Sequence, residues 1–277
     1  RITCYVTMAS RSAKKISWVH TKKLLEINSM DPVILITGAS RGIGAATALL
    51  AAEKGYAVAV NYASNAQAAE KIVTQIRTQG GTAIAIQADV ADESQVQAMF
   101  QKVDAELGPL IALVNNAGIV DVTARVDEIS VARWQRMFNI TALGTFLCSR
   151  EAVRRMSTRH GGKGGVIVNV SSAAARLGAP GQNEDYASAK GAVDDYTVGL
   201  VKEVAGEGIR VNSVRPGLID TEIHASGGIP NRVRELEHLV PMKRGGTALE
   251  VAQGIIWLVS DEASYVTTTI LDVAGGR

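Results

Sequence analysis

Short apolar runs alternate with longer amphipathic stretches along the chain from residue 33 onward. The short runs are rich in Val, Ile and Ala and lack the polar alternation of a half-exposed strand, so they predict strands buried on both faces of a parallel sheet. The seven predicted strands are Val33–Thr37, Ala57–Asn61, Ala83–Gln87, Ile111–Asn115, Val166–Val170, Arg210–Val214 and Thr269–Val273.

The longer stretches between these runs predict helices. Asp92 stands where it can cap one of them, and Gly55, Gly80 and Gly108 follow helix ends, where a left-handed residue is common. The predicted helices are Gly42–Lys54, Asn65–Gln79, Glu93–Leu107, Val131–Thr158, Asp185–Val204 and Leu249–Ser260. The alternation indicates an α/β fold, with a doubly wound seven-stranded parallel sheet flanked by helices in a single domain.

Two segments depart from this rhythm. Residues 218–246 are irregular and rich in Gly and Pro, and so long a connection is typical of a lid or binding loop. Residues 1–29 have no strong period and precede the first strand, so we expect a disordered arm, a leader or an added segment there. The predicted domain therefore covers residues 30–277.

The charge balance argues against a nucleic-acid partner. The chain has a net charge of +2, but the first thirty residues hold six cations and one acid, which leaves −3 for residues 31–277. Phosphate binding needs clustered cations, and these lie in the arm. No apolar run is long enough to span a membrane, and Cys4 and Cys148 stand alone, without metal spacing. We expect a cytoplasmic protein with neither a metal site nor a membrane partner.

A glycine-rich turn joins the first predicted strand to the first helix. It reads Thr37-Gly38-Ala39-Ser40-Arg41-Gly42-Ile43-Gly44. Glycines let the backbone approach a pyrophosphate, and the free N–H groups of the following helix attract an anion. Ile43 stands where a nucleoside triphosphate loop requires Lys. The turn therefore predicts a dinucleotide site.

The end of the second strand indicates which dinucleotide binds. NAD-selective folds place a carboxylate there to hold the ribose hydroxyls, but this chain has Asn61-Tyr62-Ala63-Ser64. Without that carboxylate a 2′-phosphate is tolerated, and Arg41 is placed to pair with it. The sequence favours NADP over NAD, with a solvated loop cation as the alternative interpretation of Arg41.

Motifs in a fixed order then follow across residues 33–277. They are the glycine turn, Ala88-Asp89-Val90, Asn115-Asn116-Ala117-Gly118, Asn139, Asn169-Val170-Ser171-Ser172, Tyr186-Ala187-Ser188-Ala189-Lys190, and Arg215-Pro216-Gly217 with Thr221. Together they resemble the classical short-chain dehydrogenase/reductase family, whose fold is of the Rossmann type. The chain is identified as a member on these motifs.

The resemblance implies roles for these residues. Asp89 and Val90 would clamp the adenine, and Asn115 would stabilise the central sheet beside the cofactor, next to Ala117 and Gly118. Asn139, Ser172, Tyr186 and Lys190 would be the catalytic set: Ser172 directs a hydroxyl at the carbonyl oxygen, Lys190 also binds the nicotinamide ribose, and Asn139 holds a relay water. Pro216, Gly217 and Thr221 would pack on the nicotinamide and bond its carboxamide. For Asp89 alone, a turn-forming role is the other interpretation.

The spacing of Tyr186 and Lys190 indicates that both side chains act at one site. Four residues apart on a predicted helix, their side chains project from one face. A phenol titrates near pH ~10, and a nearby ammonium favours the phenolate by roughly 1–3 units. We therefore expect Tyr186 to exchange protons near neutral pH while Ser172 stabilises the charge that develops on the carbonyl oxygen.

Two departures from the family pattern stand out. The spacing from Ser172 to Tyr186 is one residue longer than usual, which could reshape the substrate opening or bring in Ser171. Thr267-Thr268-Thr269 lacks a glycine common before the last strand.

We predict an NADP(H)-dependent oxidoreductase that moves a hydride between the nicotinamide and a carbonyl or secondary alcohol carbon, of the ketone or 3-oxoacyl reductase type. A sugar or polyol dehydrogenase and a non-catalytic NADP(H) sensor are the alternatives. The substrate is a small molecule of unassigned identity, and the resemblance implies a homotetramer.

Overall fold

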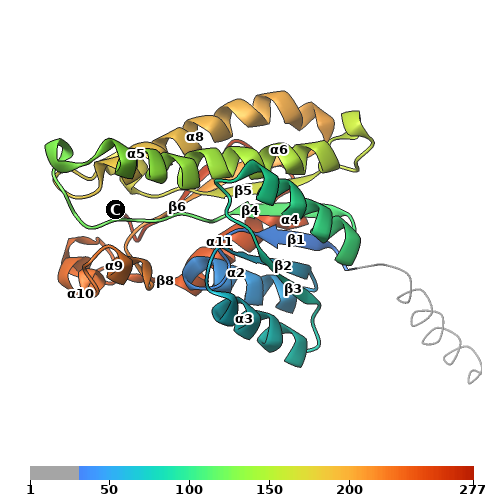
Figure 1. Ribbon diagram of the computed structural model, residues 1–277, viewed down its shortest axis with the longest axis horizontal. Helices are drawn as coiled ribbons and strands as arrows, with labels where there is room; N and C mark the ends of the chain where they lie inside the picture. Colours follow the sequence, from blue (N-terminus) through green and yellow to red (C-terminus); the bar gives the residue numbers. More distant parts are fainter. Residues whose placement is uncertain (1–30) are drawn as a thin grey trace, which may run out of the picture. The chain divides into compact units, whose positions relative to one another are not determined.

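Seven parallel strands form the centre of the structure, a computed structural model that describes residues 31–277 (Figure 1). Their order across the sheet is β3-β2-β1-β4-β5-β6-β9. All seven predicted strands are confirmed, with ends shifted by one or two residues. They are β1 (Val33–Ile36), β2 (Ala57–Tyr62), β3 (Ala83–Gln87), β4 (Leu110–Asn115), β5 (Gly165–Val170), β6 (Ile209–Pro216) and β9 (Ile270–Val273).

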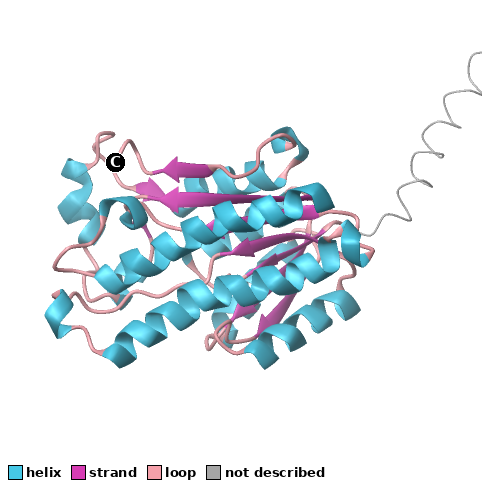
Figure 2. Cartoon of the chain, turned by 90° about the horizontal axis from the view of Figure 1, so that it is seen from above, coloured by secondary structure: helices cyan, strands magenta, loops and turns pink. Residues whose placement is uncertain are grey.

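Helices cover both faces of this sheet (Figures 1 and 2). One layer contains α2 (Gly42–Glu53), α3 (Ala66–Thr78) and α11 (Ala248–Val259), and the other contains α4 (Glu93–Glu106), α6 (Gly144–Met156) and α8 (Glu184–Val204). Alternate residues of each strand enter the two cores: Val33 and Leu35 of β1 face α4 and α6, whereas Ile34 and Ile36 face α2. The all-apolar strand pattern follows from this burial on both sides.

Local signals at the helix ends are also confirmed. Asp92 accepts hydrogen bonds from the backbone N–H groups of Ser94 and Gln95 and so caps α4. Gly55, Gly80 and Gly108 all have φ between +86° and +99°, the left-handed conformation expected of them.

The stretch predicted as one helix from Val131 to Thr158 is not regular. It consists of α5 (Val131–Phe138), a π-helical turn η3 (Asn139–Leu143) and α6. Residues 218–246 are more ordered than predicted, with the short helices α9 (Ile223–Ser226) and α10 (Arg232–Leu236) and the turn η6 (Glu237–Leu239). At its two ends, β7 (Ile219–Asp220) pairs with β8 (Gly246–Thr247), so this excursion returns to its starting point.

The sheet reverses its winding between β1 and β4. The chain moves from β1 outward to β2 and β3, then returns to the other side of β1 as β4 and continues through β5, β6 and β9. In such sheets the crevice beyond the carboxyl ends of the strands at the reversal is the usual ligand site. The fold therefore directs attention to the loops after β1 and β4.

Residues 32–277 form one compact unit. The predicted arm, residues 1–29, lies outside the described residues, so the proposed domain boundary stays a prediction. None of the helices described between residues 31 and 277 combines the length and the apolar character needed to cross a membrane.

Candidate functional site

The loops after β1 and β4 are joined by a compact set of hydrogen bonds. The Thr37 hydroxyl accepts from the backbone N–H groups of Asn116 and Ala117, both at 3.0 Å. In return the Asn116 amide donates to the carbonyl oxygens of Thr37 at 2.9 Å and Gly38 at 3.1 Å. Thr37 and Asn116 thus fix the two strand ends at the winding reversal. The sequence contained both residues, but it gave no sign of this pairing across 79 positions.

The glycine turn lies against this junction. Gly38 has a φ of +62°, and a Cβ atom there would lie 2.9 Å from the Cα of Ala117. A Cβ on Gly44 would lie 2.5 Å from the Asn116 amide nitrogen, so neither position accepts a larger residue without displacing the turn. Arg41 is exposed at the N-cap of α2, whose first turn has no acidic residue and no side-chain cap.

The side chain of Asn61, at the end of β2, makes its hydrogen bonds within the protein. It is buried, accepts a hydrogen bond from the Gly38 N–H at 3.1 Å, and donates to the carbonyl oxygens of Ile86 and Ala88. The side chain therefore ties the glycine turn to β3, which the sequence did not reveal. Ala63 and Ser64 after it are exposed.

The two residues of the predicted adenine clamp have different environments. Asp89 is exposed, and its carboxylate accepts a hydrogen bond from the Ala91 N–H at 3.0 Å, so the turn-forming role is present. Val90 is 5% exposed and belongs to the core, where it lies against Gly144. Adenine contact by Asp89 and Val90 stays a prediction.

Asn115 connects three elements at the end of β4. Its buried amide donates to the hydroxyl of Ser149 on α6 and to the side-chain oxygen of Asn169 on β5, both at 2.9 Å. Its own side-chain oxygen has no hydrogen-bond partner among residues 31–277. Asn115 thus links β4 to β5 and α6, and its role beside the cofactor stays a prediction.

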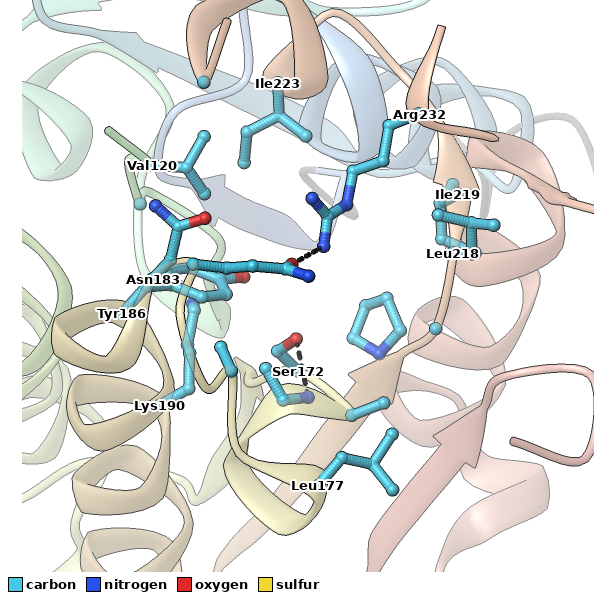
Figure 3. A pocket seen from close by; sticks show the side chains of 18 of the residues that line it. Val120, Ser172, Leu177, Asn183, Tyr186, Lys190, Leu218, Ile219, Ile223 and Arg232 are labelled. Atoms are coloured by element: carbon cyan, nitrogen blue, oxygen red, sulfur yellow. Dashed lines mark hydrogen bonds between the residues drawn. The ribbon is translucent and has the colours of Figure 1, made fainter. Parts of the chain in front are cut away.

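A cavity of about 460 Å³ opens beyond the carboxyl ends of β4, β5 and β6 (Figure 3). It brings together most of the residues predicted to act in catalysis or at the nicotinamide. These are Ser172, Tyr186, Lys190, Pro216, Gly217 and Thr221, and Ile43 of the glycine turn and Gly118 line the cavity with them. The volume is in the range of small-molecule sites in proteins.

Tyr186 and Lys190 project from α8 into this cavity, one turn apart (Figure 3). The Lys190 ammonium lies 5.8 Å from the centroid of the Tyr186 ring and donates a 2.5 Å hydrogen bond to the carbonyl oxygen of Val170. Gly118 lies beside this lysine, since a Cβ there would be 3.4 Å from the ammonium nitrogen. The two side chains therefore share one site, as their spacing predicted.

The two serines after β5 have different environments. The Ser171 hydroxyl is buried and donates to the Lys190 carbonyl oxygen at 3.1 Å, so it supports α8. The Ser172 hydroxyl accepts from the Ala174 N–H at 3.1 Å and interacts with the Tyr186 phenol. Of the two, Ser172 is the one that offers a hydroxyl beside the phenol.

Burial controls the titration of both ionisable groups. It raises the pKa of Tyr186 above 10.0, an effect that the Ser172 hydrogen bond partly offsets. It lowers the pKa of Lys190 from 10.5 to about 8, against an opposing contribution from Asp194. The net pKa of Tyr186 is therefore raised and not lowered as expected, because the effect of burial dominates over any help from an ammonium that lies over the ring, bonds to Val170 and is itself desolvated. At neutral pH the phenol is protonated.

Asn139 is the one predicted catalytic residue that does not line the cavity. It is exposed and begins the π-helical turn η3, which packs on α8. Such turns often occur at functional sites, because they displace the backbone from its regular hydrogen bonding. The predicted relay role of Asn139 stays a prediction.

The segment after β6 folds back toward the glycine turn. The Gly217 N–H donates to Val273 at 3.0 Å, and a Cβ on Gly217 would be 2.7 Å from the Cα of Ala274. Thr221 lies near Gly42, since a Cβ there would be 3.5 Å from the threonine side chain. Pro216, Gly217 and Thr221 thus line the cavity, and Thr221 lies beside the glycine turn.

One ion pair and one side-chain hydrogen bond in the outer part of the site were not predicted. Asp185 is fully buried and forms a two-point ion pair with Arg133 of α5, at 2.8 and 3.1 Å. Arg232 of α10 reaches into the cavity and donates to the side-chain oxygen of Gln182 (Figure 3). The lengthened segment between Ser172 and Tyr186 supplies both Gln182, which lines the cavity, and Asp185. That its extra residue reshapes the substrate opening stays a prediction.

Comparison with known proteins gives a consistent assignment. Residues 38–277 match the family model described as enoyl-(acyl carrier protein) reductase. The chain is 55% identical over 245 residues to the uncharacterized oxidoreductase YgfF of Escherichia coli K12, covering 88% of this chain and 99% of that protein. It is 41% identical to cis-4-hydroxycyclohexanecarboxylate dehydrogenase of Sinomonas cyclohexanicum (89% and 96% covered). It is 37% identical to the 3-oxoacyl-[acyl-carrier-protein] reductase FabG of Staphylococcus aureus (89% and 98% covered).

The chain belongs to the classical short-chain dehydrogenase/reductase family. It is an enzyme, an oxidoreductase that acts on an alcohol or carbonyl group of a small molecule and uses a nicotinamide cofactor.

Proposed function

We propose that the protein reduces the carbonyl group of a small ketone, or of a 3-oxoacyl compound, with NADPH, and catalyses the reverse oxidation of the corresponding secondary alcohol. The observation that carries this proposal is the convergence of Ser172, Tyr186 and Lys190 on one cavity next to the glycine turn. A protein that only senses the cofactor has no physical need for this set. A sugar or polyol dehydrogenase uses the same set and stays as the alternative.

The turn after β1 fits a dinucleotide phosphate. Its first residue, Gly38, is left-handed and leaves no room for a side chain, which brings the backbone close to any bound group. The N-terminus of α2 offers N–H groups without a capping side chain and without an acidic residue in its first turn. We assign the pyrophosphate to Gly38, Ser40, Gly42, Ile43 and Gly44, and the nicotinamide end to Pro216, Gly217 and Thr221.

The preference for NADP rests on charge at the end of β2. No carboxylate occurs among residues 61–64, and Arg41 makes no ion pair with another described residue. A guanidinium can bind a 2′-phosphate through two hydrogen bonds. Because Asn61 is occupied within the protein, we assign the 2′-phosphate to Arg41 with Tyr62, Ala63 and Ser64 as neighbours.

The proton chemistry falls to Tyr186. Its raised pKa keeps the phenol protonated at neutral pH, which is the form needed to give a proton to a carbonyl oxygen during reduction. The bound nicotinamide supplies the hydride. Ser172 directs its hydroxyl at the same oxygen, and the Lys190 ammonium stabilises the phenolate as the proton leaves. The relay role of Asn139 is carried over from the resemblance.

Two named activities among the relatives guide the choice of substrate. One relative is a reductase of 3-oxoacyl groups on a carrier protein, and another is a dehydrogenase of a hydroxycyclohexane carboxylate. Both interconvert a secondary alcohol and a ketone, the reaction that the site supports. The cytoplasmic location and the homotetramer stay predictions.

The test follows NADPH and NADH consumption separately with 4-oxocyclohexanecarboxylate, a 3-oxoacyl thioester and an aldose. We expect turnover of an oxo compound with NADPH and a clear preference for it over NADH. Arg41→Ala should remove that preference by roughly tenfold or more, because it deletes a charge-assisted contact. Lys54→Ala, an exposed change at the far end of α2, is the matched control. Turnover of the aldose alone would favour the alternative, and a preference for NADH would refute the assignment of Arg41.

A further inference from the structure

The charged side chains that line the cavity are all positive. Lys190, Arg232 and Arg277 are the Lys and Arg residues among the described lining residues, which include no Asp or Glu. Lys190 already has an acceptor in the Val170 carbonyl and belongs to the proposed proton chemistry. The two arginines have no such function, and both are partly buried, where a charge without an opposite charge is unfavourable. The cavity is therefore matched to an anion.

Arg232 is the better placed of the two. Its guanidinium points into the cavity from α10, across from Tyr186 and Lys190 on α8 (Figure 3). It donates to the neutral side-chain oxygen of Gln182 and forms no ion pair within the described residues. Burial lowers its pKa, the neighbouring Arg277 lowers it further, and Glu235 opposes both effects. The group is nevertheless charged at neutral pH, because an arginine does not lose its proton in proteins.

Apart from the amides of Gln182 and Asn183 near Arg232 and Tyr186, much of the cavity wall is apolar. Val120, Leu177, Ile219, Ile223 and Ile229 form this apolar part. A molecule that fills the cavity therefore meets proton-donating groups at one end, hydrocarbon walls along its body, and a guanidinium at the other end. Five donors in a planar fork match a carboxylate in two-point geometry.

We propose that the substrate is an oxo acid, or the corresponding hydroxy acid, with an apolar body and a carboxylate that binds Arg232. This inference rests on the proposed function. Gln182 holds the guanidinium in place, and Arg277 adds a second positive charge. Arg232 then selects acids over neutral ketones, whereas Tyr186 and Ser172 act on the carbonyl group at the other end. A carboxylate on the substrate itself is favoured over a phosphate on a carrier, since Arg232 lies inside the cavity that the substrate fills.

The test measures binding, so that it does not depend on turnover. The full chain, saturated with NADP⁺ so that no reduction occurs, is titrated calorimetrically with 4-oxocyclohexanecarboxylate and with its uncharged methyl ester. We expect the acid to bind roughly 10- to 100-fold more tightly than the ester, the range expected for a hydrogen-bonded charge pair. Inorganic phosphate should not displace the acid at equal concentration.

Variants on one short helix complete the test. Arg232→Gln should abolish the preference for the acid and leave the affinity for the ester unchanged, while Arg232→Lys should retain part of it. Arg234→Gln is the matched control, because Arg234 is exposed on the same helix and does not line the cavity. Equal binding of acid and ester by the unchanged protein would overturn the proposal, as would a preference that persists in Arg232→Gln or displacement by phosphate.

The two proposals fail in different ways. If the enzyme reduces neutral ketones with NADPH and shows no preference for acids, the role of Arg232 is refuted and the proposed function stands. If the acid binds through Arg232 but no oxo compound is reduced, the proposed function is refuted instead.

Discussion

The cavity is bounded by two regions that are built differently. The loop junction, residues 37–44 and 115–118, is held by hydrogen bonds of Thr37 and Asn116 to backbone groups and by glycines with no room for a side chain. The outer wall, residues 174–183 and 218–246, consists of short helices and turns linked through the side chains of Gln182 and Arg232. We therefore expect a change at Gln182 or Arg232 to leave the sheet ends in place, whereas a change in the junction displaces them.

This difference explains how one fold can keep its reaction and vary its substrate. The proposed proton donor Tyr186 and its neighbour Lys190 lie on a 21-residue helix packed against the sheet. Arg232, proposed to meet the far end of the substrate, lies on α10, a helix of five residues. The two proposals therefore assign reaction chemistry and substrate choice to different elements.

Among the paired variants, the largest expected effect distinguishes the two serines after β5. Ser172→Ala should lower kcat/KM for an oxo compound about 100- to 1000-fold, because it removes a hydroxyl directed at the developing oxyanion. Ser171→Ala removes a buried bond to the Lys190 carbonyl and should cost stability of about 1 kcal/mol with a much smaller loss of rate. Steady-state kinetics and urea unfolding of both variants provide the measurement. Equal losses of rate in both would contradict the assignment.

A second prediction contrasts the two regions directly. Thr37→Val leaves the N–H groups of Asn116 and Ala117 without their acceptor and should lower the free energy of unfolding by about 2–4 kcal/mol. Gln182→Ala in the outer wall should change it by less than about 0.5 kcal/mol. Chemical denaturation measures both. If Gln182→Ala were the more damaging change, the distinction between a rigid junction and an adjustable wall would be wrong.

The dependence of reduction on pH sharpens the role of Lys190. Its pKa of about 8 means that the ammonium, which stabilises the phenolate, is lost as the pH rises above that value. We therefore expect kcat/KM for reduction to be level at neutral pH and to fall by up to about tenfold per pH unit on the alkaline side. Lys190→Arg should move the falling limb to higher pH. A profile that rises with pH through this range would contradict the proposed role.

The smallest expected effect lies far from the cavity. Thr268, exposed before β9, has a φ of +67°, which a β-branched residue adopts only at a cost. Thr268→Gly should raise the free energy of unfolding by roughly 1 kcal/mol without changing kinetics. Thr267→Gly, which removes a hydroxyl bonded to Val211, should lower it. Thermal unfolding of the pair decides whether the missing glycine costs stability.

The sequence predicted the fold well, for physical reasons. Strands such as β1 are buried on both faces and form unbroken apolar runs, and the glycines after helix ends are required by backbone conformation. β7 and β8 were missed because two residues show no periodicity. The π-helical turn at Asn139 was missed because the apolar pattern continues through it from α5 into α6.

The site was predictable only where its residues are neighbours in sequence. Tyr186 and Lys190 are one turn apart, so their shared face followed from the helix itself. The pairing of Arg232 with Gln182 spans 50 positions, and that of Arg133 with Asp185 spans 52, and no local pattern indicates either. The pKa of Tyr186 was wrongly predicted because burial depends on the whole fold, not on the nearest charge.

The central claim is that the Tyr186 phenol gives its proton to the substrate. The phenol is not needed for the cofactor to bind. The most direct measurement is reduction by Tyr186→Phe, with NADPH affinity determined on the same sample. The account predicts a loss of kcat of about 100- to 10,000-fold with NADPH affinity unchanged within about twofold. Turnover close to that of the unchanged protein would contradict it.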